Sequence, residues 1–238
     1  MSTCQSNLSN SMTVSLREMR MVFERLLQVT RIESGLVPAL RDCAVYSAAL
    51  GLGGFSRLTA TLETISKATP KALSLDVSGD PVIDCGGQHA WLAADAALEL
   101  AVENMKTGGS GVVTVRNAKD IGELKVIEAL AQRFSLKATV AVDVDRAAIA
   151  VTQAPDPDEI ALLDKIRRNG VAVDAATWWE LYHRSAEALA PDSYLSRRHA
   201  GPIIVEADGK VIGRQDEDET DFSLLLADAP KSAASGKH

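Results

Sequence analysis

The chain has 238 residues, a formal net charge of −7, 46% hydrophobic residues and 24% charged residues. This length allows one sizeable domain or two small ones, and the composition is ordinary for a soluble globular protein. The acidic balance argues against a partner that is bound through a phosphate backbone, so no nucleic acid is expected. No apolar run has the length of a membrane span, and the polar start from Met1 to Ser11 lacks the order of a secretory signal.

The three cysteines exclude two further classes of protein. Cys4, Cys43 and Cys85 are odd in number and far apart, so neither a disulfide framework nor a zinc cluster is expected. No spacing of histidines, cysteines and carboxylates indicates another metal site. We therefore expect a protein without metal in a reduced, bacterial-type cytoplasm.

The first third of the chain predicts helices. Residues 1–13 are expected to be disordered or frayed. Ser15 and Glu18 then form a capping-box pattern that opens a helix to about Val29, with one apolar stripe. Two further helices are expected over 37–50 and 56–67, separated by a glycine-rich breaker.

After Pro70 the pattern changes to short strands and helices. Strands are expected over 73–77, 82–85, 111–117, 137–142 and 147–152, and helices over 88–106 and 122–133. We interpret this stretch as a small α/β unit whose strands alternate with crossover helices.

The end of the chain predicts a return to helices. A linker over 154–158 leads to helices over 159–168 and 175–189, the second capped by Asp174. Asp208-Gly209 predicts a hairpin turn, and the tail over 228–238 is expected to be loose.

The fold class follows from this order of elements. It is α/β, with α+β as an alternative, and a helical layer from both ends of the chain packs on a small mixed α/β unit. Both terminal segments carry apolar stripes that are too wide to leave in water. The expected domains are a helical domain (14–69 plus 156–190), an α/β domain (70–154) and a hairpin with a flexible tail (191–238).

Two motifs carry a resemblance to a known family. The first runs from Gly53 to Leu58 (Gly-Gly-Phe-Ser-Arg-Leu), and the second from Gly109 to Asn117 (Gly-Ser-Gly-Val-Val-Thr-Val-Arg-Asn). With the elements between them, they resemble the malate/L-lactate-type NAD(P)-dependent dehydrogenases, a non-Rossmann family, over residues 14–150. Residues 167–181 resemble the family's closing helix. The family's long segment between these two regions is missing here, and residues 191–238 have no counterpart.

The resemblance implies that the catalytic machinery has been lost. Gly53 stands where the family has its catalytic histidine, which supplies the proton during hydride transfer to a 2-keto acid. The arginine that would hold the substrate carboxylate is matched by Arg57.

The cofactor loop is changed as well. Its positions are Asn117, Lys119, Asp120 and Gly122, and Lys119 and Asp120 replace the family's paired histidines. Carboxylates at 143 and 145 would repel a pyrophosphate. No cofactor is therefore expected, and NAD or NADP would bind only if this interpretation of the loop is wrong.

Several candidate residues allow both a functional and a structural interpretation. Arg57 could bind a carboxylate, or could be a surface or helix-stabilising arginine. Arg197, Arg198 and His199 could form an anion site, or a solvated basic loop that pairs with the acidic run 216–221. Two other histidines favour structural roles, a solvated or capping one for His89 and edge packing for His183.

Three hypotheses about function remain. The first is a non-catalytic member of the dehydrogenase-like fold that acts as a binding or partner subunit. The second is an oxidoreductase-like or other enzyme that acts on a small carboxylated substrate at a relocated site made by Arg57, Arg197, Arg198 or His199. The third is a purely structural dimer.

The expected partners are a second copy of the chain, a small carboxylate ligand or another protein. A homodimer would cover the sheet faces and edges that the missing segment covers in the family. The alanine-rich helix over 88–106 offers a second smooth surface for it.

Overall fold

The computed structural model describes residues 10–154, 160–189, 204–205 and 211–212. The chain divides into two compact units, 1–189 and 190–238. In the second unit, β8 (Ile204–Val205) and β9 (Val211–Ile212) pair antiparallel, which confirms the predicted hairpin strands. The turn at Asp208-Gly209 and the tail lie outside the described residues.

The first unit contains a mixed five-stranded sheet in the order β2-β3-β4-β6-β5. The strands are β2 (Ser74–Asp76), β3 (Val82–Asp84), β4 (Val112–Arg116), β5 (Leu136–Val142) and β6 (Arg146–Gln153). Only the β3–β4 pair is parallel, and the other neighbours run antiparallel. The expected crossover helices are present between β3 and β4 (α4) and between β4 and β5 (α5), whereas β2–β3 and β5–β6 are hairpins without a helix.

Two helices, α4 (Trp91–Lys106) and α5 (Val126–Ala131), cover one face of this sheet. Along β5 the side chains of Leu136, Ala138 and Val140 are buried while their neighbours are exposed, which is the alternation of a sheet with one covered face.

Most alanines of α4, and Ala90 just before it, point into this core, whereas Ala96 is exposed. Ala90, Ala93, Ala94, Ala97 and Ala101 are each 0% exposed. The expectation that they offer a surface to a second chain is wrong, because α4 already packs on the sheet and on neighbouring helices through them.

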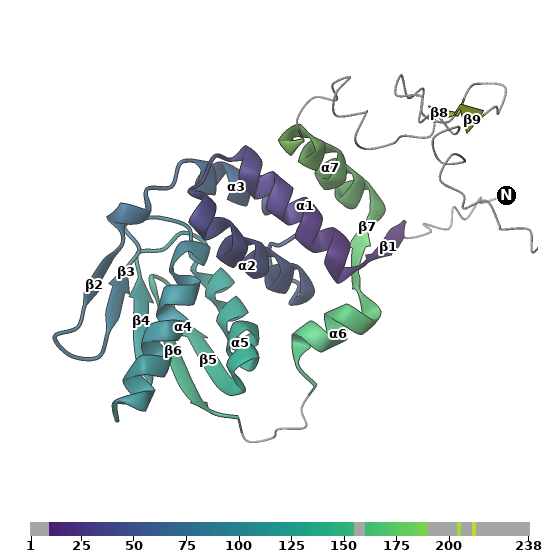
Figure 1. Ribbon diagram of the computed structural model, residues 1–238. Helices are drawn as coiled ribbons and strands as arrows, with labels where there is room; N and C mark the ends of the chain where they lie inside the picture. Colours follow the sequence, from purple (N-terminus) through teal and green to yellow (C-terminus); the bar gives the residue numbers. More distant parts are fainter. Residues whose placement is uncertain (1–9, 155–159, 190–203, 206–210, 213–238) are drawn as a thin grey trace, which may run out of the picture. The chain divides into compact units, whose positions relative to one another are not determined.

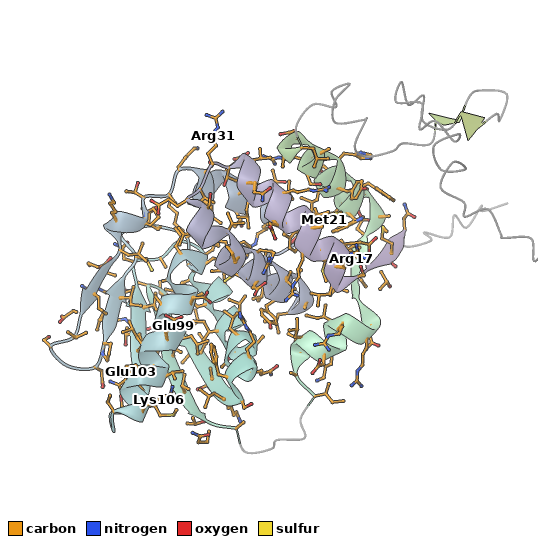
Figure 2. All side chains as sticks on the ribbon, in the orientation of Figure 1. Arg17, Met21, Arg31, Glu99, Glu103 and Lys106 are labelled. Carbon is orange, nitrogen blue, oxygen red and sulfur yellow. The ribbon has the colours of Figure 1, made fainter. Side chains whose placement is uncertain are left out.

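The exposed side of α4 is charged instead. Figure 2 shows Glu99, Glu103 and Lys106 along this helix, and all three are exposed.

The remaining helices build outward from α4 and α5. They are α1 (Leu16–Val29), α2 (Val37–Ala49), α3 (Leu58–Ser66), α6 (Leu162–Asn169) and α7 (Ala175–Ser185). α2 packs on α4 and α5, α1 packs on α2, and α7 packs on α1 (Figure 1). The predicted packing of the two ends of the chain against each other is confirmed, and so is the α/β fold class.

Both predicted helix caps are present. The Ser15 hydroxyl accepts from the Glu18 backbone N–H, and the Glu18 carboxylate accepts from the Ser15 backbone N–H, which completes the capping box of α1. The Asp174 carboxylate accepts from the Thr177 N–H at the start of α7.

One element was missed by the sequence analysis. β1 (Ser11–Val14) and β7 (Val171–Asp174) form a two-stranded antiparallel sheet. The expected disorder up to residue 13 is therefore wrong for Ser11–Thr13. Gly170 has a φ of +68°, and a Cβ there would lie 2.6 Å from the Val14 carbonyl oxygen, so a glycine lets β7 begin beside β1.

Candidate functional site

The motif that resembles the dehydrogenases lies between α2 and α3. A Cβ on Gly54 would clash with the backbone nitrogen of Ala48, so this loop rests directly on α2. Phe55 packs edge-on between Phe23 of α1 and Trp178 of α7, with ring centroids 5.8 and 6.2 Å apart. The loop is therefore held by helices from both ends of the chain.

The centre of the site is the carboxylate of Glu123, whose residue is only 3% exposed. Its Oε1 accepts from the Gly53 N–H at 2.8 Å and from Arg57 Nη2 at 3.0 Å. Its Oε2 accepts from Ser47 Oγ at 2.6 Å and from Trp91 Nε1 at 3.1 Å. Four donors satisfy both oxygens of this buried charge, and we call these five residues the Glu123 cluster.

Arg57 is engaged by acidic side chains of its own chain. Its Nη1 lies 3.0 Å from Asp120 Oδ1 and its Nη2 lies 3.0 Å from Glu123 Oε1. The arginine side chain is 57% exposed, but its guanidinium group already pairs with the carboxylates of Asp120 and Glu123. Arg57 thus links the α2–α3 loop to the segment after β4.

Gly53 has no room for a larger residue. A Cβ at this position would lie 2.8 Å from Glu123 Oε1 and 2.9 Å from Arg57 Nε. A histidine here would have to displace the ion pair between Glu123 and Arg57.

His89 lies beside this cluster and is 1% exposed, so the solvated role is wrong, and the residue precedes Ala90, the N-cap of α4. Its Nδ1 accepts from the backbone N–H of Trp91, the first residue of α4, at 3.2 Å. The proton of the neutral ring is therefore on Nε2, which lies 3.6 Å from Asp120 Oδ2 and has no hydrogen-bond partner among the described residues. Burial lowers the pKa of His89 to about 4, against a smaller opposing effect of Asp120.

The segment that matches the cofactor loop follows β4 and has an irregular backbone. Asn117 and Asp120 adopt left-handed conformations, with φ of 53° and 52°. The Asn117 N–H donates to the carbonyl of Asp145, so the segment meets the β5–β6 turn. Asp143 and Asp145 are exposed in that turn, and the carboxylate of Asp145 pairs with Arg146 at 3.1 Å.

A cavity of about 320 Å³ opens beside this segment. Its lining is polar and includes Lys119 and Lys67, the residue that follows α3. The other lining residues are Ala60, Glu63, Thr64, Gly87 and Gln88. Arg57 does not line this cavity.

Other predicted site residues are not brought together with Arg57. Arg197, Arg198 and His199 lie outside the described residues. His183 is exposed and packs edge-on against Tyr182, with ring centroids 5.9 Å apart, whereas its ring is tilted by 33° relative to that of Trp179, one turn earlier. Within the described ranges, no group of three or more potential ligands could hold a metal ion, and no helix is long and apolar enough to cross a membrane.

Glu123, Ser47 and Trp91 were not predicted as site residues. The segment from Ile121 to Ala131 also carries Lys125 and Glu128, so its pattern does not single out the carboxylate at 123. A buried charge in such a segment requires several donors, but the sequence does not say which ones.

Comparisons with known proteins support a dehydrogenase-like fold. No family profile and no curated protein matches the sequence. Among solved structures, the chain is similar to a dehydrogenase from Sinorhizobium meliloti, with a TM-score of 0.55, 11% identity, and coverage of 74% of this chain and 100% of that one.

Two weaker similarities involve larger proteins. A sulfolactate dehydrogenase from Methanocaldococcus jannaschii gives a TM-score of 0.41 with 20% identity, over 52% of this chain and 38% of that one. A malate dehydrogenase from Entamoeba histolytica gives 0.45 with 16% identity, over 92% and 61%. The chain therefore spans less than two thirds of either protein.

Replacing the central carboxylate tests the Glu123 cluster. We expect Glu123→Ala to lower the free energy of unfolding by about 3–5 kcal/mol, because Ser47, Trp91 and the Gly53 N–H would lose their acceptor in a buried place. Urea unfolding measures the change. The matched control is Glu103→Ala on the exposed side of α4, which should stay within about 0.5 kcal/mol of the parent protein. Equal effects of the two substitutions would contradict the role of Glu123.

The low pKa of His89 predicts a pH dependence of stability. The unfolded histidine binds a proton below its ordinary pKa of 6.5, whereas the folded one does so only near 4. Stability is therefore unaffected by this group above pH 6.5 and falls as the pH drops towards 4. The difference between the two pKa values corresponds to a loss of roughly 3 kcal/mol in the free energy of unfolding.

The variant His89→Asn should have a shallower loss of stability over this pH range. Its side-chain oxygen can still accept from the Trp91 N–H, as asparagine does at a helix start. Urea unfolding at several pH values compares the variant with the parent protein. Identical slopes for the two proteins would show that His89 does not titrate as described.

Proposed function

We propose that this chain is a non-catalytic relative of the malate/L-lactate-type dehydrogenases that acts as a binding or partner subunit. The observation that carries the proposal is the ion pair between Arg57 and Glu123 beside Gly53. Arg57, which would bind a substrate carboxylate, instead forms ion pairs with Asp120 and Glu123 of the same chain. The position of the proton donor has neither a side chain nor the space for one.

The environment of the cofactor segment supports the same proposal. Asp120 uses its carboxylate on Arg57, and Asp143 and Asp145 add exposed negative charge in the adjoining turn. A dinucleotide carries its own negative charge at the pyrophosphate, so these carboxylates oppose its binding.

The alternative function is an oxidoreductase-like or other enzyme with a relocated site for a small carboxylated substrate. The observation in its favour is the cavity of about 320 Å³ beside the same segment, because Lys67 and Lys119 could attract an anion there. This alternative requires a reactive group that is not Arg57.

Cofactor binding separates the two proposals. We expect no binding of NADH or NADPH in the micromolar range, because the loop offers carboxylates where the family offers histidines. Titration followed by cofactor fluorescence or calorimetry measures it, with an active malate/L-lactate-type dehydrogenase as the positive control. A micromolar Kd for either cofactor, or turnover of a 2-keto acid with it, would restore the dehydrogenase interpretation.

For the partner we propose a second copy of the chain, docked on the uncovered face of the five-stranded sheet. At the centre of this open sheet face, exposed or half-buried side chains form two rows across β4, β6 and β5, and the exposed Arg116, Arg146 and Lys137 lie towards the ends of the same face. The rows are Val112, Ala150 and Thr139, and Thr114, Ala148 and Ala141. All six are small or β-branched residues without charge, so two such faces could stack closely.

A homodimer predicts a molar mass near twice the 25.3 kDa of the chain in light scattering. Ala148→Arg should give a monomer, because it places a charge at the centre of the open sheet face, whereas Ala172→Arg, at an exposed alanine of β7, should leave the mass unchanged. A parent protein that stays monomeric as its concentration rises would refute the dimer. A dimer that survives Ala148→Arg would refute this interface.

A further inference from the structure

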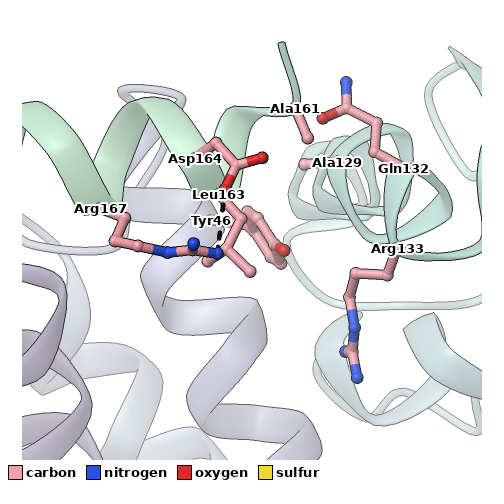
Figure 3. Close-up of a pocket in the computed structure, with 8 residues that line it drawn as sticks. All are labelled: Tyr46, Ala129, Gln132, Arg133, Ala161, Leu163, Asp164 and Arg167. Carbon is pink, nitrogen blue, oxygen red and sulfur yellow. Dashed lines mark ion pairs between the residues drawn. The ribbon is translucent and has the colours of Figure 1, made fainter. Parts of the chain in front are cut away.

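A second pocket lies between α2, α5 and α6. Its volume is about 180 Å³, smaller than the roughly 300 Å³ at which pockets for drug-sized ligands begin. Figure 3 shows the eight lining residues: Tyr46, Ala129, Gln132, Arg133, Ala161, Leu163, Asp164 and Arg167.

Tyr46 is the polar group at the centre of this pocket. The residue is only 2% exposed, and its hydroxyl donates no hydrogen bond to any of the described residues. Burial raises the pKa of Tyr46, so the hydroxyl keeps its proton at neutral pH. The hydroxyl oxygen is not enclosed in the core but opens to the pocket, so its hydrogen is available to an acceptor there.

Two arginines flank the tyrosine. Figure 3 shows the ring of Tyr46 between the side chains of Arg167 and Arg133. Arg167 Nη2 pairs with Asp164 Oδ1 at 2.9 Å, and Arg133 Nη1 pairs with Asp42 Oδ2 at 3.3 Å. A guanidinium has five N–H donors, so each arginine keeps donors for a further acceptor.

The lining of the pocket has more hydrogen-bond donors than acceptors. Arg133 and Arg167 are permanently positive and are paired with Asp42 and Asp164, of which only Asp164 lines the pocket. Gln132 uses its Oε1 to accept from the Leu162 N–H at 2.8 Å, which leaves its amide N–H donors free of that bond. The polar side of the pocket therefore suits a ligand that accepts hydrogen bonds.

The rest of the wall is apolar. Ala129, Ala161 and Leu163 offer methyl groups rather than hydrogen-bond partners. A ligand with a short carbon chain fills such a wall better than a fully hydrated inorganic ion does.

We propose that the pocket between α2, α5 and α6 binds a small carboxylate, with its oxygens facing Tyr46, Arg133 and Arg167 and its carbon atoms against Ala129, Ala161 and Leu163. The Tyr46 hydroxyl donates one hydrogen bond, and the guanidinium groups supply charge-assisted ones. The site shares no residue with the Glu123 cluster, so this proposal can be tested independently of the proposed loss of dehydrogenase activity.

Protein-detected NMR titration of the full chain tests the site with acetate, pyruvate and succinate, and with inorganic phosphate. We expect at least one carboxylate to shift the backbone signals around Tyr46, Arg133 and Arg167. Tyr46→Phe should weaken its binding about tenfold, the effect of losing one hydrogen bond to a charged group. Arg167→Gln should weaken it to a similar degree.

Two matched variants separate the site from general effects. Tyr182→Phe changes an exposed tyrosine of α7, and Arg17→Gln changes an exposed arginine of α1, so both should bind as the parent protein does. Thermal unfolding checks that each variant is folded, and the carboxylate should raise the Tm of the parent protein more than that of Tyr46→Phe.

Three results would overturn the proposal. The first is that no carboxylate binds even at tens of millimolar. The second is that Tyr46→Phe and Arg167→Gln bind as tightly as the two control variants. The third is that phosphate alone binds with the same dependence on Tyr46, which would make the pocket an inorganic anion site.

Discussion

The buried carboxylate of Glu123 is the interaction on which the organisation of the first unit depends. It accepts hydrogen bonds from α2 through Ser47, from the following loop through Gly53 and Arg57, and from α4 through Trp91. Taking a charge out of water is costly, so the arrangement is stable only while all four donors are in place. This requirement fixes how the helical layer sits on the α/β layer.

The same interaction links stability to the proposed loss of chemistry. Glu123 occupies the space into which a side chain at Gly53 would extend, and it shares Arg57 with Asp120. A site that must accept a substrate leaves its cation open, whereas Arg57 is used to hold the fold together. Placing a histidine at 53 alone would therefore cost stability before it could supply a proton.

The way the helices stack decides which surfaces remain for binding. α4 and α5 cover one face of the sheet, and all further helices of the layer add to that same side. The centre of the opposite sheet face carries small uncharged side chains, while the pocket between α2, α5 and α6 is lined by Tyr46 and two arginines. One surface thus suits a flat protein contact and the other a small anion.

The sequence by itself determined the local elements and the fold class. Local patterns that span a few residues can be recognised in the sequence alone. They include the capping box at Ser15, the cap at Asp174 and the apolar periodicities. It also singled out Arg57 and the glycine at 53. Only the tertiary structure decided what these residues do, because the partner Glu123 is 66 residues away from Arg57. The pairing of β1 with β7, the burial of His89 and the inward alanines of α4 likewise depend on neighbours far along the chain, which no local pattern specifies.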